Sequence, residues 1–126
     1  ATAAFSCTVR GLGGFPSLER PRVLWAGVGD GADAVSALAA RVRDALTARG
    51  FAGEDRAFVP HITLARITAR APVDAAALER AMPGAATRAF GSSDIDRLVL
   101  YASELRPAGP VYTVVDTWPL AGTAST

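Results

Sequence analysis

The segment around the single histidine limits most strongly what this chain can fold into. It runs Phe58-Val59-Pro60-His61-Ile62-Thr63-Leu64-Ala65-Arg66 and holds the only histidine of the chain. The segment is typical of a β-strand, in which successive side chains point to opposite faces. Alternation predicts that one face carries His61 and Thr63. It also predicts that the other face is apolar and packs in a core, with the residues Phe58, Ile62 and Leu64.

The face with His61 and Thr63 suits proton-transfer chemistry. Two residues apart on a strand, the side chains lie about 7 Å from each other. Imidazole exchanges protons near neutral pH, and a hydroxyl beside it can hold a substrate oxygen. A lone histidine on a strand is also commonly a surface residue or a hydrogen-bonded core residue. On these residues alone, both interpretations stay open.

Composition narrows the class of protein. With 126 residues, half of them hydrophobic, residues 1–126 are expected to form a single domain with its own core. No apolar run is long enough for a membrane span. A net charge of +1 argues against a large basic nucleic-acid surface but permits a small phosphate pocket. Cys7 is the only cysteine, which excludes an internal disulfide and favours a cytoplasmic location.

The order of predicted elements gives the fold class. Strands are expected at 5–10, 22–28, 58–66, 87–90, 95–105 and 111–118. One helix is expected to begin at a cap formed by Asp30 or Asp33 and to end at Gly50, and a second to span 75–82 after a cap formed by Asp74. The glycine cluster at 11–14 predicts a turn. This order, without a regular βαβ repeat, predicts an α+β fold with antiparallel sheets and helices packed on the outside.

Pro60-His61-Ile62-Thr63-Leu64, followed by Arg66, resembles the His-x-Thr motif of the two-histidine (2H) phosphoesterases. The similarity is greatest to the LigT-like RNA 2′,3′-cyclic phosphodiesterases, and it extends to 22–28, 98–105 and 112–115. The resemblance implies a two-lobed, pseudo-symmetric fold and metal-independent hydrolysis of RNA 2′,3′-cyclic phosphate ends to 2′-phosphates. It implies no metal and no cofactor, and RNA ends or cyclic nucleotides as substrates.

The resemblance also assigns roles to residues. His61 is expected to transfer a proton, and Thr63 to hydrogen-bond a phosphate oxygen. Arg66 is a candidate phosphate ligand because the chain has no lysine and the arginine fork suits phosphate. Simple alternation places Arg66 on the face opposite His61, so its reach depends on the strand twisting or ending there. Tyr101 and Tyr112 are expected either to stack on a base or to pack, and Trp25 and Trp118 to lie in the core.

One departure from the family pattern limits these implications. The family has two His-x-Thr motifs, and this sequence has the second only, so we expect the N-terminal portion with the first motif to be missing. Three functions stay open: the phosphodiesterase, a non-catalytic module that binds a phosphorylated nucleotide or RNA end, and a fragment that is inactive without the missing segment. An incomplete lobe would also leave apolar surface bare and favour a homodimer.

Overall fold

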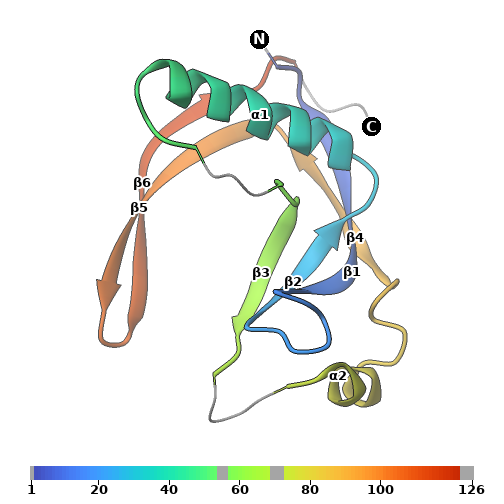
Figure 1. Cartoon of the computed structure of the whole chain (residues 1–126). Coiled ribbons are helices and arrows are strands. Elements are labelled where there is room, and N and C mark those ends of the chain that lie inside the picture. Colours follow the sequence, from blue (N-terminus) through green and yellow to red (C-terminus); the bar gives the residue numbers. More distant parts are fainter. Residues whose placement is uncertain (1, 54–56, 69–72, 123–126) are drawn as a thin grey trace. The chain divides into compact units, whose positions relative to one another are not determined.

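The computed structural model describes residues 2–53, 57–68 and 73–122. Within them the order of elements is the predicted one, β-β-α-β-α-β-β-β (Figure 1). The elements are β1 (Phe5–Phe15), β2 (Val23–Val28), α1 (Ala32–Ala48), β3 (His61–Arg66), α2 (Ala75–Ala81), β4 (Ala89–Ile95), β5 (Arg97–Arg106) and β6 (Gly109–Pro119).

The strands form two sheets. A four-stranded sheet has the order β3-β2-β1-β4, and β5 pairs with β6 in a two-stranded sheet. The β1–β2, β2–β3 and β5–β6 pairs are all antiparallel. The predicted α+β class with antiparallel sheets is therefore confirmed. Strand β3 lies at the edge of its sheet, which is where Pro60, without an amide hydrogen, is tolerated just before the strand begins.

The chain divides into two compact units. One unit comprises Cys7–Ser93 and holds β2, α1, β3 and α2. The other is built around the β5–β6 hairpin and includes the start of the chain, where the Ala4 amide donates to the Ala121 carbonyl at 2.9 Å. Within the same unit the Ser6 hydroxyl donates to the Asp94 carboxylate at 2.7 Å. That both units belong to one domain stays a prediction.

The glycine cluster does not form the predicted turn, because β1 continues through it to Phe15. The β1–β2 register shifts between Val9 and Leu12, so the strand carries a bulge there. Gly11 has φ 78°, a conformation that favours glycine, and its amide donates to the Arg88 carbonyl at 2.8 Å. The glycines thus accommodate an irregular strand that is paired on both sides.

The two helices begin differently from one another. Asp74 caps α2 as predicted, since its carboxylate accepts a hydrogen bond from the Ala77 amide at 2.8 Å. The predicted cap of α1 by Asp30 or Asp33 is wrong, because the N-cap is Gly31, with φ 88° and no side-chain hydrogen bond. The predicted end of α1 is confirmed.

At that end Gly50 has φ 91°, and the Phe51 amide returns to the Leu46 carbonyl at 3.1 Å. Neither described helix is long and apolar enough to cross a membrane.

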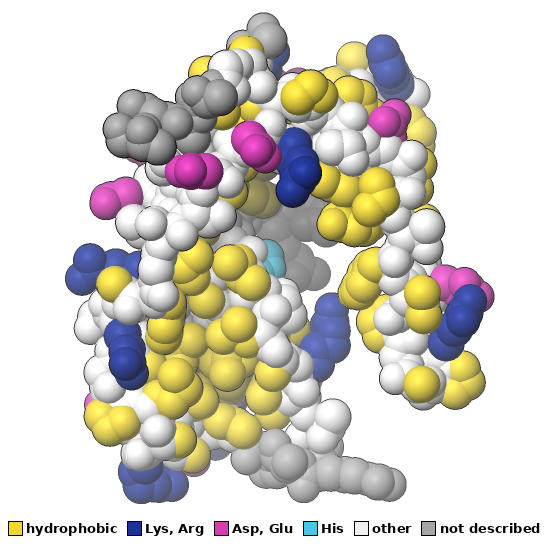
Figure 2. All heavy atoms as spheres, turned by 180° about the vertical axis from the view of Figure 1, so that it is seen from behind, with side chains coloured by type: hydrophobic (Ala, Val, Ile, Leu, Met, Phe, Trp, Pro, Cys, Tyr) yellow, Lys and Arg dark blue, Asp and Glu magenta, His cyan; other side chains and the backbone are white. Residues whose placement is uncertain are grey.

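The buried apolar core of the described residues is small. Its members lie within the unit Cys7–Ser93: Cys7, Leu12, Ala26 and Ala85. The prediction that Phe58, Ile62 and Leu64 pack in a core is wrong for this chain, because their exposed fractions are 49%, 48% and 55%. The prediction of a core position for Trp118 is also wrong, since it is 45% exposed. Figure 2 shows hydrophobic side chains spread over the surface. Alternation predicts which residues share a face, but burial also needs something to cover that face.

Candidate functional site

Strand β3 presents His61 and Thr63 on one face, as alternation predicts. His61 pairs with Gly27 and Thr63 with Trp25 on the neighbouring strand β2. Paired residues in a sheet point to the same face, and Trp25 and Gly27 are two positions apart on a regular strand. Both His61 and Thr63 are exposed, and the histidine is visible at the surface in Figure 2. The imidazole and the hydroxyl are therefore accessible from one side of the sheet.

The imidazole of His61 is held through one of its nitrogens. Its Nδ1 lies 2.7 Å from the carbonyl oxygen of Val59. A carbonyl only accepts hydrogen bonds, so we assign the proton of the neutral ring to Nδ1. Nε2 is then the nitrogen with a free lone pair. A ring in this tautomer can accept a proton at Nε2, and in its charged form it can donate one from the same atom.

Two aromatic rings contact the imidazole. Phe15 of β1 meets it edge to face, with ring centroids 5.0 Å apart and an interplanar angle of 88°. Trp25 of β2 lies 5.9 Å from it at 58°. Phe15 and Trp25 also contact each other at 5.2 Å. From the sequence, Trp25 was expected in the core. Phe15 had no predicted role, because the strand at 5–10 was expected to end before it.

Arg66 lies on the same face as Thr63, contrary to the expectation from simple alternation. Trp25 pairs with Thr63, Leu24 with Ala65 and Val23 with Arg66, so the register shifts between Leu24 and Trp25. Leu64 is the additional residue of this β-bulge. Because Val23 and Trp25 point to one face of β2, the shift returns Arg66 to the face of Thr63. The arginine is exposed.

Tyr101 and Tyr112 form a pair on the β5–β6 hairpin. Their ring centroids lie 6.4 Å apart at 78°, an edge-to-face arrangement. Tyr112 pairs with Ser103, and Tyr101 lies two positions before Ser103 on β5, so both rings occupy one face. Their exposed fractions are 55% and 63%. They belong to the unit built around this hairpin, whereas His61, Thr63 and Arg66 belong to the unit Cys7–Ser93.

Other parts of the chain offer less chemistry. Among the described residues, no cluster of three or more histidine, cysteine or acidic side chains is arranged to hold a metal ion. Burial raises the pKa of the Cys7 thiol, which makes it a poor nucleophile.

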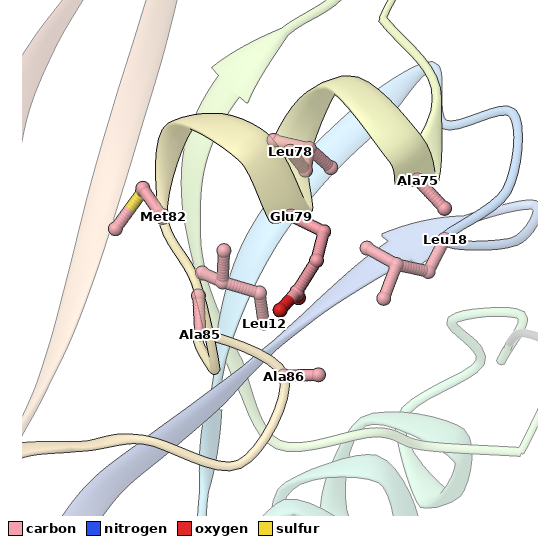
Figure 3. A pocket seen from close by; sticks show the side chains of 8 residues that line it. All are labelled: Leu12, Leu18, Ala75, Leu78, Glu79, Met82, Ala85 and Ala86. Carbon is pink, nitrogen blue, oxygen red and sulfur yellow. The ribbon is translucent and has the colours of Figure 1, made fainter.

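Figure 3 shows a pocket between α2 and β1, lined by apolar residues such as Leu12 and Leu78 and by Glu79. Its volume of about 30 Å³ suits a few water molecules at most. The Glu79 carboxylate already accepts a hydrogen bond from the Gly84 amide at 3.1 Å. We assign this pocket to the packing of α2.

Known proteins resemble this chain over nearly its whole length. Residues 27–112 match the family described as LigT like Phosphoesterase, a region that includes His61, Thr63 and Arg66. The chain is 36% identical over 119 residues to a protein of Aquifex aeolicus named RNA 2′,3′-cyclic phosphodiesterase, covering 94% of this chain and 62% of that protein. A protein of Aeropyrum pernix with the same name is 38% identical over 108 residues, covering 86% of this chain and 60% of its own length.

Solved structures have the same fold. A crystal structure of a Thermus thermophilus protein superposes with a TM-score of 0.72 at 34% identity, covering 96% of this chain and 63% of that one. LigT of E. coli, crystallised with 3′-AMP, gives a TM-score of 0.68 at 26% identity and covers 96% and 62%. The chain thus spans slightly under two thirds of the length of these relatives. From the family match and the identity to these relatives, the chain belongs to the LigT-like phosphoesterase family, within the 2H phosphoesterases.

Proposed function

We propose that this chain carries the second His-x-Thr site of a metal-independent phosphodiesterase that opens RNA 2′,3′-cyclic phosphate ends to 2′-phosphates. The relatives of Aquifex aeolicus and Aeropyrum pernix bear the name of this activity. The observation that carries the proposal is the hydrogen bonding and exposure of the His61 ring. Its Nδ1 is engaged by the Val59 carbonyl, and its exposed ring shares a face with Thr63.

The proposed reaction needs two proton transfers. A base removes a proton from water as the water oxygen attacks phosphorus. An acid then gives a proton to the 3′ oxygen of the ribose as the bond from phosphorus to that oxygen breaks, which leaves a 2′-phosphate. His61 Nε2 takes one of these roles. The second role belongs to another group, because the chain has no second histidine.

Thr63 and Arg66 are proposed to bind the phosphate. Negative charge on the non-bridging oxygens grows in the transition state, so donors aimed at these oxygens lower the barrier. The Thr63 hydroxyl can donate one hydrogen bond, and the Arg66 guanidinium can donate two in parallel. The bulge at Leu64 supports this proposal, since it returns Arg66 to the face that carries His61 and Thr63.

Tyr101 and Tyr112 are proposed to stack on a base of the substrate. Exposed aromatic rings on a strand are common platforms for unpaired bases. The two phenol rings are more than half exposed and share one face of the hairpin, which supports the assignment. Packing against another polypeptide is the alternative use of the same surface. A homodimer through the exposed apolar residues, and a cytoplasmic location, also stay predictions.

A second function, phosphate or RNA-end binding without turnover, has one observation in its favour. A single histidine can transfer a proton on one side of the phosphorus but not on both sides at once. Such a module would bind through the same three residues of β3. The two functions differ in turnover and agree on the binding site, so binding is the property to test first.

Calorimetric titration with a 2′-phosphorylated nucleotide tests the site. Wild-type chain is expected to bind more weakly at alkaline pH than at acidic pH, because imidazolium attracts the anion and neutral imidazole does not. His61→Ala is expected to remove the part of that pH dependence that comes from the imidazole, and the titration of the phosphate itself remains. Thr63→Val keeps the branched shape but loses the hydroxyl, and is expected to weaken binding about tenfold at every pH. Thr47→Val on α1 is the matched control. Equal affinities in all of these proteins would refute the site.

A further inference from the structure

Three rings from three neighbouring strands form one cluster around the candidate site. Phe15 of β1, Trp25 of β2 and His61 of β3 contact one another in every pairing, with ring centroids 5.0 to 5.9 Å apart. Phe15 and Trp25 are half-buried, whereas His61 is exposed. The edge-to-face contact with Phe15 is lost if the imidazole makes a quarter-turn about its Cβ–Cγ bond, whereas a half-turn restores the ring plane. The cluster therefore restrains the ring plane of its most exposed side chain.

One glycine makes room for the Trp25 ring, and a second glycine lies beside the ring. Gly13 pairs directly with Trp25 across β1 and β2, and a Cβ atom added there would overlap the six-membered ring of the indole. A Cβ atom on Gly27 would lie 2.9 Å from the Arg10 carbonyl oxygen and 3.4 Å from Trp25 Cζ3. An aromatic ring lying over a glycine of the next strand shields that backbone and is fixed by it. A glycine is therefore needed at position 13 because any side chain there would overlap the Trp25 ring.

Ring packing, and not hydrogen bonding, sets the position of the indole. Trp25 Nε1 is buried and has no hydrogen-bond partner among the described residues. An unpaired buried N–H lowers stability, so it gives the ring no anchor of its own. What holds Trp25 in place is its contact with Gly13, Phe15 and His61. A phenylalanine at position 25 keeps a ring in that place and removes the unpaired group.

We propose that Trp25 and Phe15 are positioning residues for His61, and that Gly13 is part of the same device because it makes room for the Trp25 ring. The two rings hold the imidazole in the plane in which Nδ1 donates to the Val59 carbonyl, and this hydrogen bond leaves the lone pair of Nε2 free. The proposal rests on the proposed function only for what Nε2 does there. The orientation itself is a property of the chain without any ligand.

Nitrogen NMR of the imidazole measures that orientation directly. His61 is the only histidine, so a nitrogen-15 spectrum of the labelled chain contains one imidazole. Above neutral pH the wild-type ring is expected to be mainly the Nδ1–H tautomer. Trp25→Leu, Phe15→Leu and Gly13→Ala are each expected to lower the ratio of Nδ1–H to Nε2–H by about twofold to tenfold, the range of an aromatic contact. Trp25→Phe is expected to retain the wild-type ratio.

Matched controls come from the same chain. Trp118→Leu removes the other tryptophan, and Gly53→Ala adds a Cβ atom at a glycine where its nearest contact is an ordinary 3.5 Å. Both are expected to leave the ratio unchanged. Amide spectra identify variants that fail to fold, and Phe15→Leu and Gly13→Ala test the proposal if Trp25→Leu is one of them. An unchanged ratio in the folded variants, or a wild-type ring that is mainly Nε2–H, would overturn the proposal.

The same variants separate this proposal from the function. If the tautomer ratio falls but wild-type chain binds no 2′-phosphorylated nucleotide, positioning stands and the proposed function fails. If wild-type chain binds the nucleotide and the ratio does not change in the variants, the function stands and positioning fails. If both hold, nucleotide affinity is expected to fall with the fraction of rings in the Nδ1–H form, which changes by a smaller factor than the ratio of the two forms.

Discussion

Thr63 and Arg66 lie on the same face of β3, although simple alternation along the strand places them on opposite faces. The cause is one additional residue, Leu64, opposite the step from Leu24 to Trp25. A bulge changes which side chains share a face without changing any residue type. In this strand it gathers an imidazole, a hydroxyl and a guanidinium on one side of the sheet edge.

The first prediction concerns Arg66. If its guanidinium binds the phosphate through two parallel hydrogen bonds, Arg66→Lys keeps the charge but loses the fork, and affinity for a 2′-phosphorylated nucleotide falls about tenfold. Arg66→Ala is expected to cost more than Arg66→Lys. Arg80→Ala, which removes an exposed arginine of α2 in the same unit, is expected to change affinity less than twofold. If calorimetry gives Arg66→Ala and Arg80→Ala the same affinity for the nucleotide, the assignment of Arg66 is contradicted.

The second prediction concerns pH and stability. Cys7 is 6% exposed, and burial raises the pKa of its thiol above the usual value. The unfolded chain therefore releases the thiol proton at lower pH than the folded chain does. The contribution of this thiol to the free energy of unfolding is fully present below the ordinary thiol pKa of about 8.5. It is lost as the pH rises from there through the folded-state pKa. Urea unfolding at a series of pH values measures the slope, and Cys7→Ala is expected to flatten it. An equal slope in both proteins would show that other groups cause it.

The third prediction concerns turnover. The proposed reaction uses two proton-transfer groups, each of which contributes a factor of about 10² to 10⁴, and this chain has one histidine. The chain alone is expected to open 2′,3′-cyclic AMP slower than a full-length relative by at least that factor. Release of 2′-AMP is the measurement. Turnover near that of the relative would refute this account, and loss of that turnover on dilution would indicate two chains sharing one site.

The fourth prediction concerns assembly. The β5–β6 hairpin exposes apolar residues, with Leu105 86%, Tyr112 63% and Val115 59% exposed. Such a surface on a two-stranded sheet favours self-association. Sedimentation velocity is expected to show a dimer at high concentration that Leu105→Ser weakens. Leu46→Ser, on the exposed end of α1, is the control. A monomer at all concentrations would leave the homodimer without support.

Local patterns predicted the elements well, because their causes are local. Asp74 caps α2 through its own neighbour Ala77, and Gly50 with Phe51 ends α1 through Leu46. The bulges at Gly11 and Leu64 could not be predicted from one strand, since register is a property of a pair of strands. The sequence pattern therefore predicted a turn at Gly11. It also placed Arg66 on the face of the strand opposite His61.

Burial and aromatic packing also depend on partners that are distant in the sequence. The predicted apolar stripe of Phe58, Ile62 and Leu64 is buried only if something covers it, and in this chain these residues are about half exposed. Trp25 was expected in a core, but it lies against Gly13 and beside His61. The predicted site residues of β3 were therefore found on the expected strand, while the residues that hold His61 were not anticipated.

The most direct test of the central claim follows the single imidazole during a nucleotide titration. The claim is that His61 and Thr63 line one phosphate-binding site. Proton–carbon NMR of the His61 ring, recorded as 2′-AMP is added, is expected to show saturable shifts, with the Thr63 amide moving at the same ligand concentrations. Thr63→Val is expected to raise the 2′-AMP concentration at the midpoint of these shifts about tenfold. Ring signals that stay in place while the nucleotide reaches saturating concentration would contradict the claim.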